Sequence, residues 1–117
     1  MGARRLWGIA LALLCGEACG QVRLLVQSSP LAGVRYHAAA EVWPQLRVGD
    51  PLELGREPAN PHDANAISVS WRGRKLGYLP RRENAAAAWS LDRGQALRAR
   101  IARISSRGRI EIELYAE

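Results

Sequence analysis

The sequence predicts a small all-β domain, a closed or nearly closed barrel of about six strands with one or two short helices. Short segments in which apolar and polar residues alternate recur along most of the chain, and a period of two is typical of half-buried strands. Short turns separate these segments. With 117 residues the chain has room for one small domain. A barrel suits this size because closure leaves few free strand edges.

The first half of the predicted domain contains strands on either side of a short helical segment. In chain order we expect a strand over Gln21–Gln27, a turn over Ser28–Gly33, an extended run over Val34–His37, a short helix or turn within Ala38–Leu46 and a strand over Pro51–Glu57. Val22, Leu24 and Val26 alternate with polar residues, so they are predicted to face the core. Pro44 limits the helix to about two turns. Trp43 is expected to plug the core.

The second half is predicted as two hairpins joined by a helix. The expected elements are strands over Ala66–Arg72 and Lys75–Leu79, a helix over Arg81–Leu91, and strands over Gln95–Ser105 and Arg109–Tyr115. Gly94 suits the end of the helix. Arg98 and Arg100 are placed to face Glu111 and Glu113 across the last hairpin, which indicates a neutralised outer surface.

Residues 1–20 are predicted to be a secretory signal peptide, and residues 21–117 the domain. Arg4 and Arg5 precede an apolar run over Gly8–Cys15, and small residues follow it. This run is shorter than the roughly 20 residues that span a bilayer. We therefore expect a secreted or periplasmic protein with no integral membrane span after cleavage, or a cytoplasmic protein if this segment is not a functional signal.

The composition is basic and poor in metal ligands. Lys and Arg number 17 against 11 Asp and Glu, and every one except Lys75 is arginine, whose planar fork suits phosphate contacts. A GC-rich genome would also enrich arginine, so the positions carry more weight than the total. Cys15 and Cys19 both lie in the predicted signal peptide. The predicted domain therefore has no structural disulfide and no cysteine zinc site, and we expect no metal and no cofactor.

The segment Arg56–Ile67 is the most distinctive local pattern. Two prolines restrict its backbone, and Asn60 and Asp63 are residue types that hydrogen-bond their own backbone in turns. His62 offers a ring for stacking beside the acceptor-only carboxylate of Asp63. Such a pair suits binding of a ligand that carries a hydroxyl group. The alternative interpretation is an ordinary polar turn.

Two basic clusters accompany the predicted elements. Arg72, Arg74 and Lys75 surround the turn of the first hairpin, and we interpret them as a solvated tip. Arg81 and Arg82 open the predicted helix, where the macrodipole disfavours cations. This conflict is resolved if free backbone N–H groups and the arginines together bind a phosphate. Alternatively, Arg82 pairs with a surface carboxylate.

The chain resembles the HIRAN family over Val22–Tyr115. The resemblance rests on Arg35-Tyr36-His37, on the loop Glu57-Pro58-Ala59-Asn60-Pro61-His62-Asp63-Ala64-Asn65-Ala66, on Gly77-Tyr78-Leu79 and on the basic residues that open the following helix. HIRAN domains are OB-like barrels, so the resemblance implies a small OB-like β-barrel here.

The resemblance also implies a ligand. In HIRAN domains fused to Swi/Snf-type fork-remodelling translocases, the ligand is a 3′ end of single-stranded DNA. By this resemblance Tyr36 and His62 would stack the terminal bases, and Asp63 would accept a hydrogen bond from the 3′-hydroxyl. Arg35 and Arg81 would hold phosphates. The complete expected set of nucleic-acid-binding residues is Arg35, Tyr36, His37, Asn60, His62, Asp63, Tyr78 and Arg81.

The predicted function is that of a monomeric module that binds the 3′ end of single-stranded DNA or a related anionic ligand. Two alternatives stay open: a phosphohydrolase acting on nucleotides or acid anhydrides, with Asp63 and His62 or His37 as acid and base, and a structural envelope protein without nucleic acid. An enzyme is disfavoured because the sequence has no Gly-rich phosphate loop and no metal-ligand spacing. We expect no catalytic residue.

Overall fold

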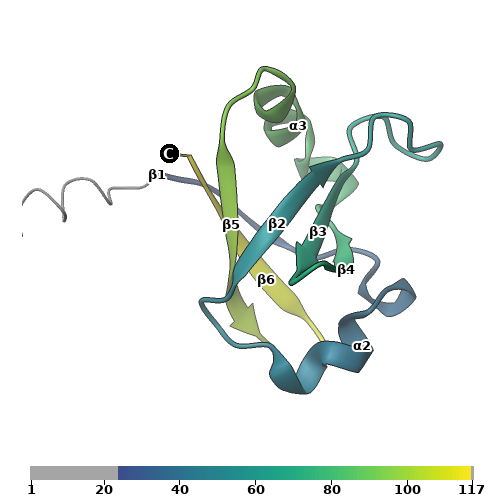
Figure 1. Cartoon of the computed structure of the whole chain (residues 1–117), viewed down its shortest axis with the longest axis vertical. Coiled ribbons are helices and arrows are strands. Elements are labelled where there is room, and N and C mark those ends of the chain that lie inside the picture. Colours follow the sequence, from purple (N-terminus) through teal and green to yellow (C-terminus); the bar gives the residue numbers. More distant parts are fainter. Residues whose placement is uncertain (1–23, 117) are drawn as a thin grey trace, which may run out of the picture.

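Six antiparallel strands form the sheet of this protein, in the spatial order β1-β6-β5-β2-β3-β4. The computed structural model describes residues 24–116, so the expected signal peptide over residues 1–20 lies outside the described part (Figure 1). The strands are β1 (Leu24–Pro30), β2 (Pro51–Arg56), β3 (Ile67–Trp71), β4 (Arg74–Tyr78), β5 (Leu97–Ile104) and β6 (Ile110–Ala116). The helices are α2 (Ala39–Val42), α3 (Ala85–Asp92) and the 3₁₀ turns η1 (Val34–Tyr36), η2 (Trp43–Gln45) and η3 (Arg81–Glu83).

The two ends of this strand order are joined by the chain that follows β1. Ala32 and Tyr78 form a β-bridge with two backbone hydrogen bonds, N–H of Ala32 to O of Tyr78 at 2.8 Å and N–H of Tyr78 to O of Ala32 at 2.9 Å. Nearby, the Leu31 amide donates to the Ile110 carbonyl at 2.9 Å. The sheet therefore closes on itself, and the predicted small barrel is confirmed.

Strand β2 changes partners along its length. Its first residues, Pro51 and Leu52, pair with β5, whereas Glu53–Arg56 pair with β3. The β2–β3 hairpin thereby leaves the plane of β5 and β6 and carries the segment that connects β2 to β3 away from the body of the barrel (Figure 1). This connection is the loop singled out in the sequence.

The core is filled from the inward positions of the strands, as the alternation of apolar residues predicts. Ile67, Val69 and Trp71 of β3 are buried, and so are Ile110, Ile112 and Leu114 of β6. Val42 and Leu46 close one side, and Ala87 and Ala88 of α3 another. Trp43 was expected to plug the core; it is half-buried and packs against the core from its edge.

The prediction for the first strand was wrong about which residues are buried and about where the strand ends. Leu24 and Val26 were expected in the core, but Leu24, Leu25 and Val26 are 69%, 55% and 50% exposed, so neither face is buried at the start of β1. The pairing register of β1 with β6 shifts between Leu25 and Gln27, and an extra residue of this kind moves the side chains that follow it to the other face. The strand then continues through Pro30 where a turn was predicted, and Ser29 is buried.

Two further elements differ from the sequence-based expectation. Val34–Tyr36 forms a 3₁₀ turn instead of an extended run, because Gly33 has a positive φ of 69° and turns the chain into it. The single helix expected over Arg81–Leu91 is split: η3 is closed by the bond from the Glu83 amide to the Pro80 carbonyl, and α3 begins only at Ala85.

The outer surface of the last hairpin is neutralised as predicted, with one change of partner. Arg100 Nε lies 3.1 Å from Glu113 Oε1, whereas Glu111 pairs with Arg103 at 3.5 Å. The register of β5 shifts between Ile101 and Arg103, which brings Arg103 opposite Glu111. Within residues 24–116 no helix is long and apolar enough to cross a membrane.

Candidate functional site

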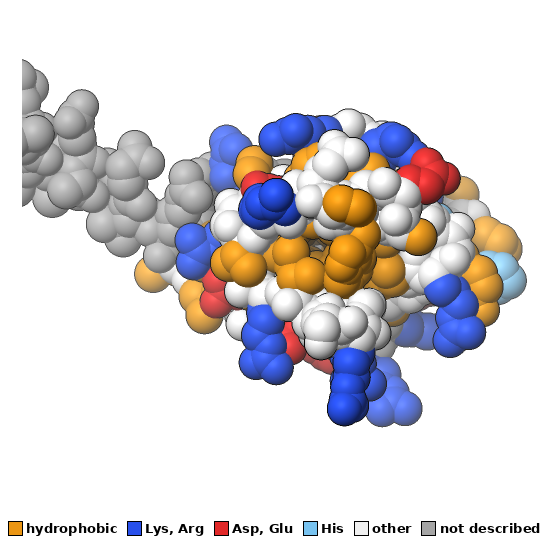
Figure 2. Space-filling view, turned by 90° about the horizontal axis from the view of Figure 1, so that it is seen from below, with side chains coloured by type: hydrophobic (Ala, Val, Ile, Leu, Met, Phe, Trp, Pro, Cys, Tyr) orange, Lys and Arg blue, Asp and Glu red, His pale blue; other side chains and the backbone are white. Residues whose placement is uncertain are grey.

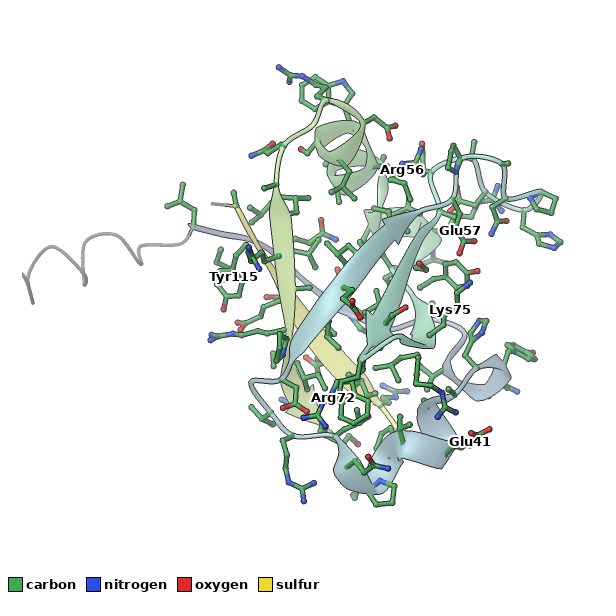
Figure 3. The ribbon with its side chains drawn as sticks, in the orientation of Figure 1. Glu41, Arg56, Glu57, Arg72, Lys75 and Tyr115 are labelled. Atoms are coloured by element: carbon green, nitrogen blue, oxygen red, sulfur yellow. The ribbon has the colours of Figure 1, made fainter. Side chains whose placement is uncertain are left out.

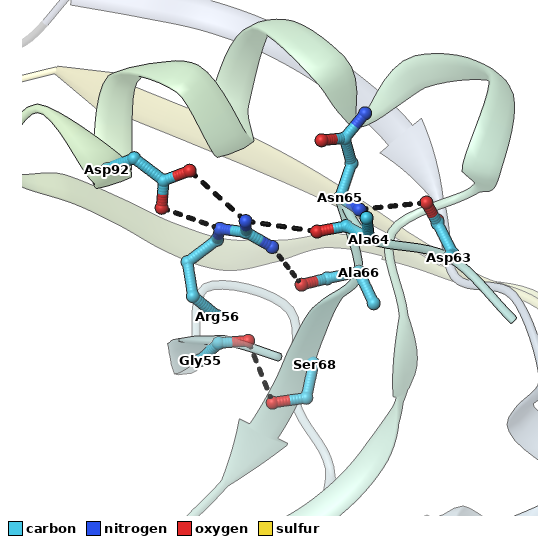
Figure 4. A network of polar contacts seen from close by, with 8 residues as sticks. All are labelled: Gly55, Arg56, Asp63, Ala64, Asn65, Ala66, Ser68 and Asp92. Carbon is cyan, nitrogen blue, oxygen red and sulfur yellow. Dashed lines mark hydrogen bonds and ion pairs between the residues drawn. The ribbon is translucent and has the colours of Figure 1, made fainter. Parts of the chain in front are cut away.

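The loop between β2 and β3 is clamped at its base by Arg56 (Figure 4). The guanidinium donates to the carbonyl of Ala66 at 2.9 Å and to that of Ala64 at 3.1 Å. On its other side it forms two hydrogen bonds with the carboxylate of Asp92 at the end of α3, at 2.8 and 3.1 Å. These contacts hold the pKa of Asp92 below its ordinary value. One side chain therefore ties both the returning loop backbone and α3 to the end of β2.

The tip of the loop is shaped by its own polar side chains, as predicted. Asn60 Oδ1 accepts a hydrogen bond from the His62 amide at 2.9 Å, and Asp63 Oδ1 accepts one from the Asn65 amide at 2.9 Å. Both are bonds from a side chain to the backbone two residues on, the pattern by which Asn and Asp stabilise turns. These two hydrogen bonds fix the backbone at His62 and just after it, and so hold the position of the His62 side chain.

Asp63 is held from inside the protein as well as from the loop. Its Oδ2 accepts a hydrogen bond at 2.8 Å from the side-chain amide of Asn84, which is 1% exposed. The Asn84 and Asn65 bonds, with Arg81 and Arg56 nearby, lower the pKa of Asp63 below its ordinary value. The carboxylate is therefore ionised at neutral pH. Each oxygen keeps a second lone pair for a further donor.

A second polar network fixes the wall beside the loop (Figure 3). Glu57 accepts hydrogen bonds from Lys75 Nζ at 2.8 Å, from the Tyr78 hydroxyl at 2.9 Å and from Asn60 Nδ2 at 3.1 Å. Its pKa is lowered, chiefly by Lys75, and the pKa of Lys75 is raised in turn. His37 packs against the ring of Tyr78 at 5.5 Å in an edge-on arrangement.

The interpretation of the first hairpin as a solvated tip holds for Arg72 and Arg74, which are exposed, whereas Lys75 is half-buried. Lys75 is paired with Glu57, and Arg74 forms a salt bridge with Glu41. The guanidinium of Arg72 lies over the ring of Trp71 at 4.6 Å. The carboxylate partners of Lys75 and Arg74 come from elements distant in sequence, so the charge run alone could not reveal them.

Five of the eight predicted site residues gather around one hollow of about 320 Å³, here called the loop pocket. It is lined by Ala32, Gly33, Asn60, His62, Asp63, Tyr78, Leu79 and Arg81. Ala32 and Tyr78, which form the β-bridge that closes the barrel, both line it, so this pocket depends on that closure. His62 and Arg81 are exposed, and Asp63 and Tyr78 are half-buried.

Arg35 and Tyr36 line a different hollow of about 600 Å³, which we call the arginine pocket. It is bounded by Pro30, Leu31, Gly33, Val34, Arg35, Tyr36, Arg107, Gly108, Arg109 and Ile110. Gly33 lines both pockets, so they adjoin. The third predicted residue of this segment, His37, lines neither pocket and instead supports Tyr78.

Sequence reasoning missed four residues that belong to this region. Glu57 and Asn84 hold the polar groups of the loop pocket, and Arg107 and Arg109 line the arginine pocket. The Arg-Gly-Arg run at the last hairpin was a visible signal, but only the approach of that turn to η1 gives it a role. Nothing in the sequence around Asn84 indicated its contact with Asp63, because that contact depends on Asn84 being buried in the fold.

Salt bridges determine which arginines are left for a ligand. In the part of the chain that the structure describes, Arg56, Arg74, Arg100 and Arg103 are paired with carboxylates. Within that same part, no salt bridge involves Arg81 of the loop pocket or Arg35, Arg107 and Arg109 of the arginine pocket. Across residues 24–116, no group of three or more His, Cys, Asp or Glu side chains could hold a metal ion.

The fold and the site define a small OB-like barrel domain with two adjoining pockets lined by polar residues and arginines. The chain belongs to the HIRAN domain family, whose model matches residues 24–117. Family membership supports a nucleic-acid-binding role in general terms.

Two solved structures are similar to this chain. A protein from Lactobacillus plantarum has 31% sequence identity and a TM-score of 0.75, over 81% of this chain and 95% of that one. The HIRAN domain of human HLTF has 20% identity and a TM-score of 0.61, over 81% of this chain and 80% of that one. The search of curated proteins found no match.

Proposed function

We propose that this domain binds the 3′-hydroxyl end of single-stranded DNA, or of a closely related anionic strand, in the loop pocket. One observation carries the proposal: an ionised carboxylate, Asp63, and a guanidinium outside any salt bridge among the described residues, Arg81, line the same small hollow. A ligand that satisfies both groups must offer a hydrogen-bond donor next to a negative charge. The end of a nucleic-acid strand does this, with a hydroxyl beside the first phosphodiester.

The electrostatics of the pocket favour a hydroxyl over a phosphate at the terminal position. Asp63 is an acceptor that is already ionised, so it attracts a hydroxyl donor and repels a terminal phosphate. Arg81 attracts the phosphate one step into the strand. The rings of His62 and Tyr78 line the same pocket and offer faces to a base, a contact that tolerates any sequence.

End recognition is tested by comparing two oligonucleotides that differ only at the 3′ terminus. The one with a free 3′-hydroxyl is expected to bind at least about tenfold more tightly than the one with a 3′-phosphate, a difference of about 1.4 kcal/mol. Fluorescence anisotropy at fixed salt measures both dissociation constants. A pair that differs only in its 5′-phosphate serves as the control and should show little difference. Equal affinity for the two 3′ forms contradicts the role of Asp63.

The same assay distinguishes a specific phosphate contact of Arg81 from nonspecific attraction by the positive charge of the protein. Arg81→Ala should reduce the slope of log affinity against log salt by about 0.7, the value for one phosphate contact on a single strand. Arg72→Ala is the matched control, because Arg72 is also exposed but lies over Trp71, away from the pocket. Equal losses in the two variants would mean that binding follows total charge only.

We also propose that residues 1–20 direct export of the domain, which would make extracellular DNA or another anionic polymer the strand it meets. The charged start and short apolar run support this proposal. A fusion of residues 1–20 to a reporter enzyme that is active only outside the cytoplasm should be active. A reporter that begins at Gln21 is the control. If the fusion to residues 1–20 is inactive, the export proposal is wrong and the protein is expected in the cytoplasm.

A further inference from the structure

An apolar hollow adjoins the arginine pocket on the side of α2. It has a volume of about 530 Å³ and is lined by Val34, Arg35, Ala39, Ala40, Trp43, Pro44 and Gly108. Figure 2 looks at the molecule from below the view of Figure 1 and shows hydrophobic side chains gathered on this face, with Lys and Arg side chains around them. Trp43 is half-buried, so part of its side chain is left open to the surface.

The hollow and the arginine pocket share part of their walls. Val34, Arg35 and Gly108 line both. Arg35, Arg107 and Arg109 are exposed, and none of them forms a salt bridge with a carboxylate within residues 24–116. Neither hollow is lined by an acidic side chain. The surface therefore combines an apolar recess with three available positive charges at its edge.

The turn that carries two of these arginines is ordered by its own hydrogen bonds. The Arg107 amide donates to Ser105 Oγ at 3.0 Å, and the Ser105 amide donates to the Arg109 carbonyl at 2.8 Å. Gly108 supplies the positive φ of 83° that the turn requires. The hydrogen bond from Leu31 to Ile110 ties this hairpin to the segment that leads into η1. The three arginines are thus set around one recess by the backbone.

We propose that the apolar hollow and the arginine pocket together bind a further nucleotide unit beyond the two at the 3′ end, the base in the hollow against Trp43 and the flanking phosphates at Arg35, Arg107 and Arg109. A base has flat apolar faces and its phosphates are anionic, so this pairing of surfaces is complementary to it. Because Gly33 lines both the loop pocket and the arginine pocket, the unit belongs to the same strand. The inference therefore rests on the proposed function and extends it to a longer ligand.

Strand length provides the first test. A hexanucleotide and a dinucleotide, both single-stranded DNA with a free 3′-hydroxyl, are titrated at several salt concentrations. The Arg107→Gln/Arg109→Gln double variant should lose about 1.4 units of salt slope for the hexanucleotide, two phosphates at about 0.7 each, while its dinucleotide affinity stays within about twofold. Arg103→Gln is the control, since Arg103 is exposed on the same hairpin but paired with Glu111.

Filling the hollow provides the second test without touching any arginine. Ala40 is exposed on α2 and lines the hollow, so a larger helix-forming residue fits there at little cost to the fold. Ala40→Glu should weaken hexanucleotide binding at least about fivefold, since it places a carboxylate where the base and phosphate lie. Ala40→Lys has similar bulk and the opposite charge and should retain more affinity than Ala40→Glu. Thermal unfolding confirms that both variants are folded.

The outcomes separate this inference from the proposal on which it rests. If the unaltered protein binds both oligonucleotides and the double variant keeps the full salt slope for the hexanucleotide, the second subsite is wrong and the end site stands. If Ala40→Glu and Ala40→Lys bind the hexanucleotide as the unaltered protein does, the hollow takes no base. If the unaltered protein binds neither oligonucleotide, the proposed function and this inference fail together.

Discussion

Gly77→Ala should lower the free energy of unfolding by about 2–4 kcal/mol and abolish binding in the loop pocket. A Cβ atom at residue 77 would lie 2.5 Å from the carbonyl oxygen of Ala32, which is backbone and has no rotamer to change. That oxygen accepts the hydrogen bond from Tyr78 that closes the barrel. The clash therefore acts on the contact between Ala32 and Tyr78, two residues that line the loop pocket. Urea denaturation gives the stability, and oligonucleotide titration gives the binding.

Gly73→Ala is the matched control for this prediction. It makes the same chemical change just before β4, at a glycine with φ of 80° where an added Cβ meets nothing within 4 Å. Only backbone strain is introduced, so we expect a cost of about 1 kcal/mol and unchanged binding. If the two variants lose stability equally, the Ala32–Tyr78 bridge does not limit the stability of the barrel.

Glu57→Gln should destabilise the protein by about 1–3 kcal/mol at neutral pH and weaken oligonucleotide binding. The carboxylate of Glu57 accepts from Lys75, Tyr78 and Asn60, and two of these three line the loop pocket. Glutamine has the same shape but no charge for Lys75 and only one acceptor oxygen. Glu57 and Lys75 side chains are 29% and 36% exposed, so solvent screening keeps the effect in this range.

The lowered pKa of Glu57 determines how its contribution to stability changes with pH. The folded-state pKa of Glu57 lies below its ordinary value of 4.5, so its stabilising contribution is fully present above that pH and is lost as pH falls through the lowered pKa. The stability difference between the unaltered protein and Glu57→Gln should shrink below about pH 4.5. Asp63 and Asp92 also have lowered pKa values, but they titrate in both proteins and cancel.

An exposed salt bridge provides the comparison. Glu41→Gln removes the partner of Arg74, and the Glu41 side chain is 73% exposed. We expect a change of at most about 0.5 kcal/mol there, as is usual for surface pairs. A stability difference for Glu57→Gln that stays constant from pH 7 to pH 3 would show that the charge of Glu57 contributes nothing to the fold.

The turn chemistry of the loop could be predicted because it is local. Asn60 and Asp63 bond to amides two residues away, and no other part of the chain is needed for that. The inward faces of β3 and β6 followed in the same way from alternation. The burial pattern of β1 did not: its first three residues are exposed on both faces, and the register shift that follows arises from pairing with β6, a strand at the other end of the sequence.

The candidate site also combines features that the sequence predicted with features that depend on the tertiary structure. The residues of the loop, together with Tyr78 and Arg81, were expected in one place and do line one pocket. Arg35 and Tyr36 were expected beside them, but η1 directs both into the adjoining arginine pocket. Arg107 and Arg109 were assigned no role, because their position against η1 depends on the way the barrel closes.

By itself, the sequence determined the β class of this protein, the strand alternation and the bonded geometry of the loop, since these depend on contacts between near neighbours in the chain. The tertiary structure alone decided which charges are neutralised and which line a pocket. An ion pair forms between whichever side chains the fold brings within reach, and here Glu57 meets Lys75, and Arg56 meets Asp92, across long separations in sequence. Four arginines outside these salt bridges then line the loop pocket and the arginine pocket.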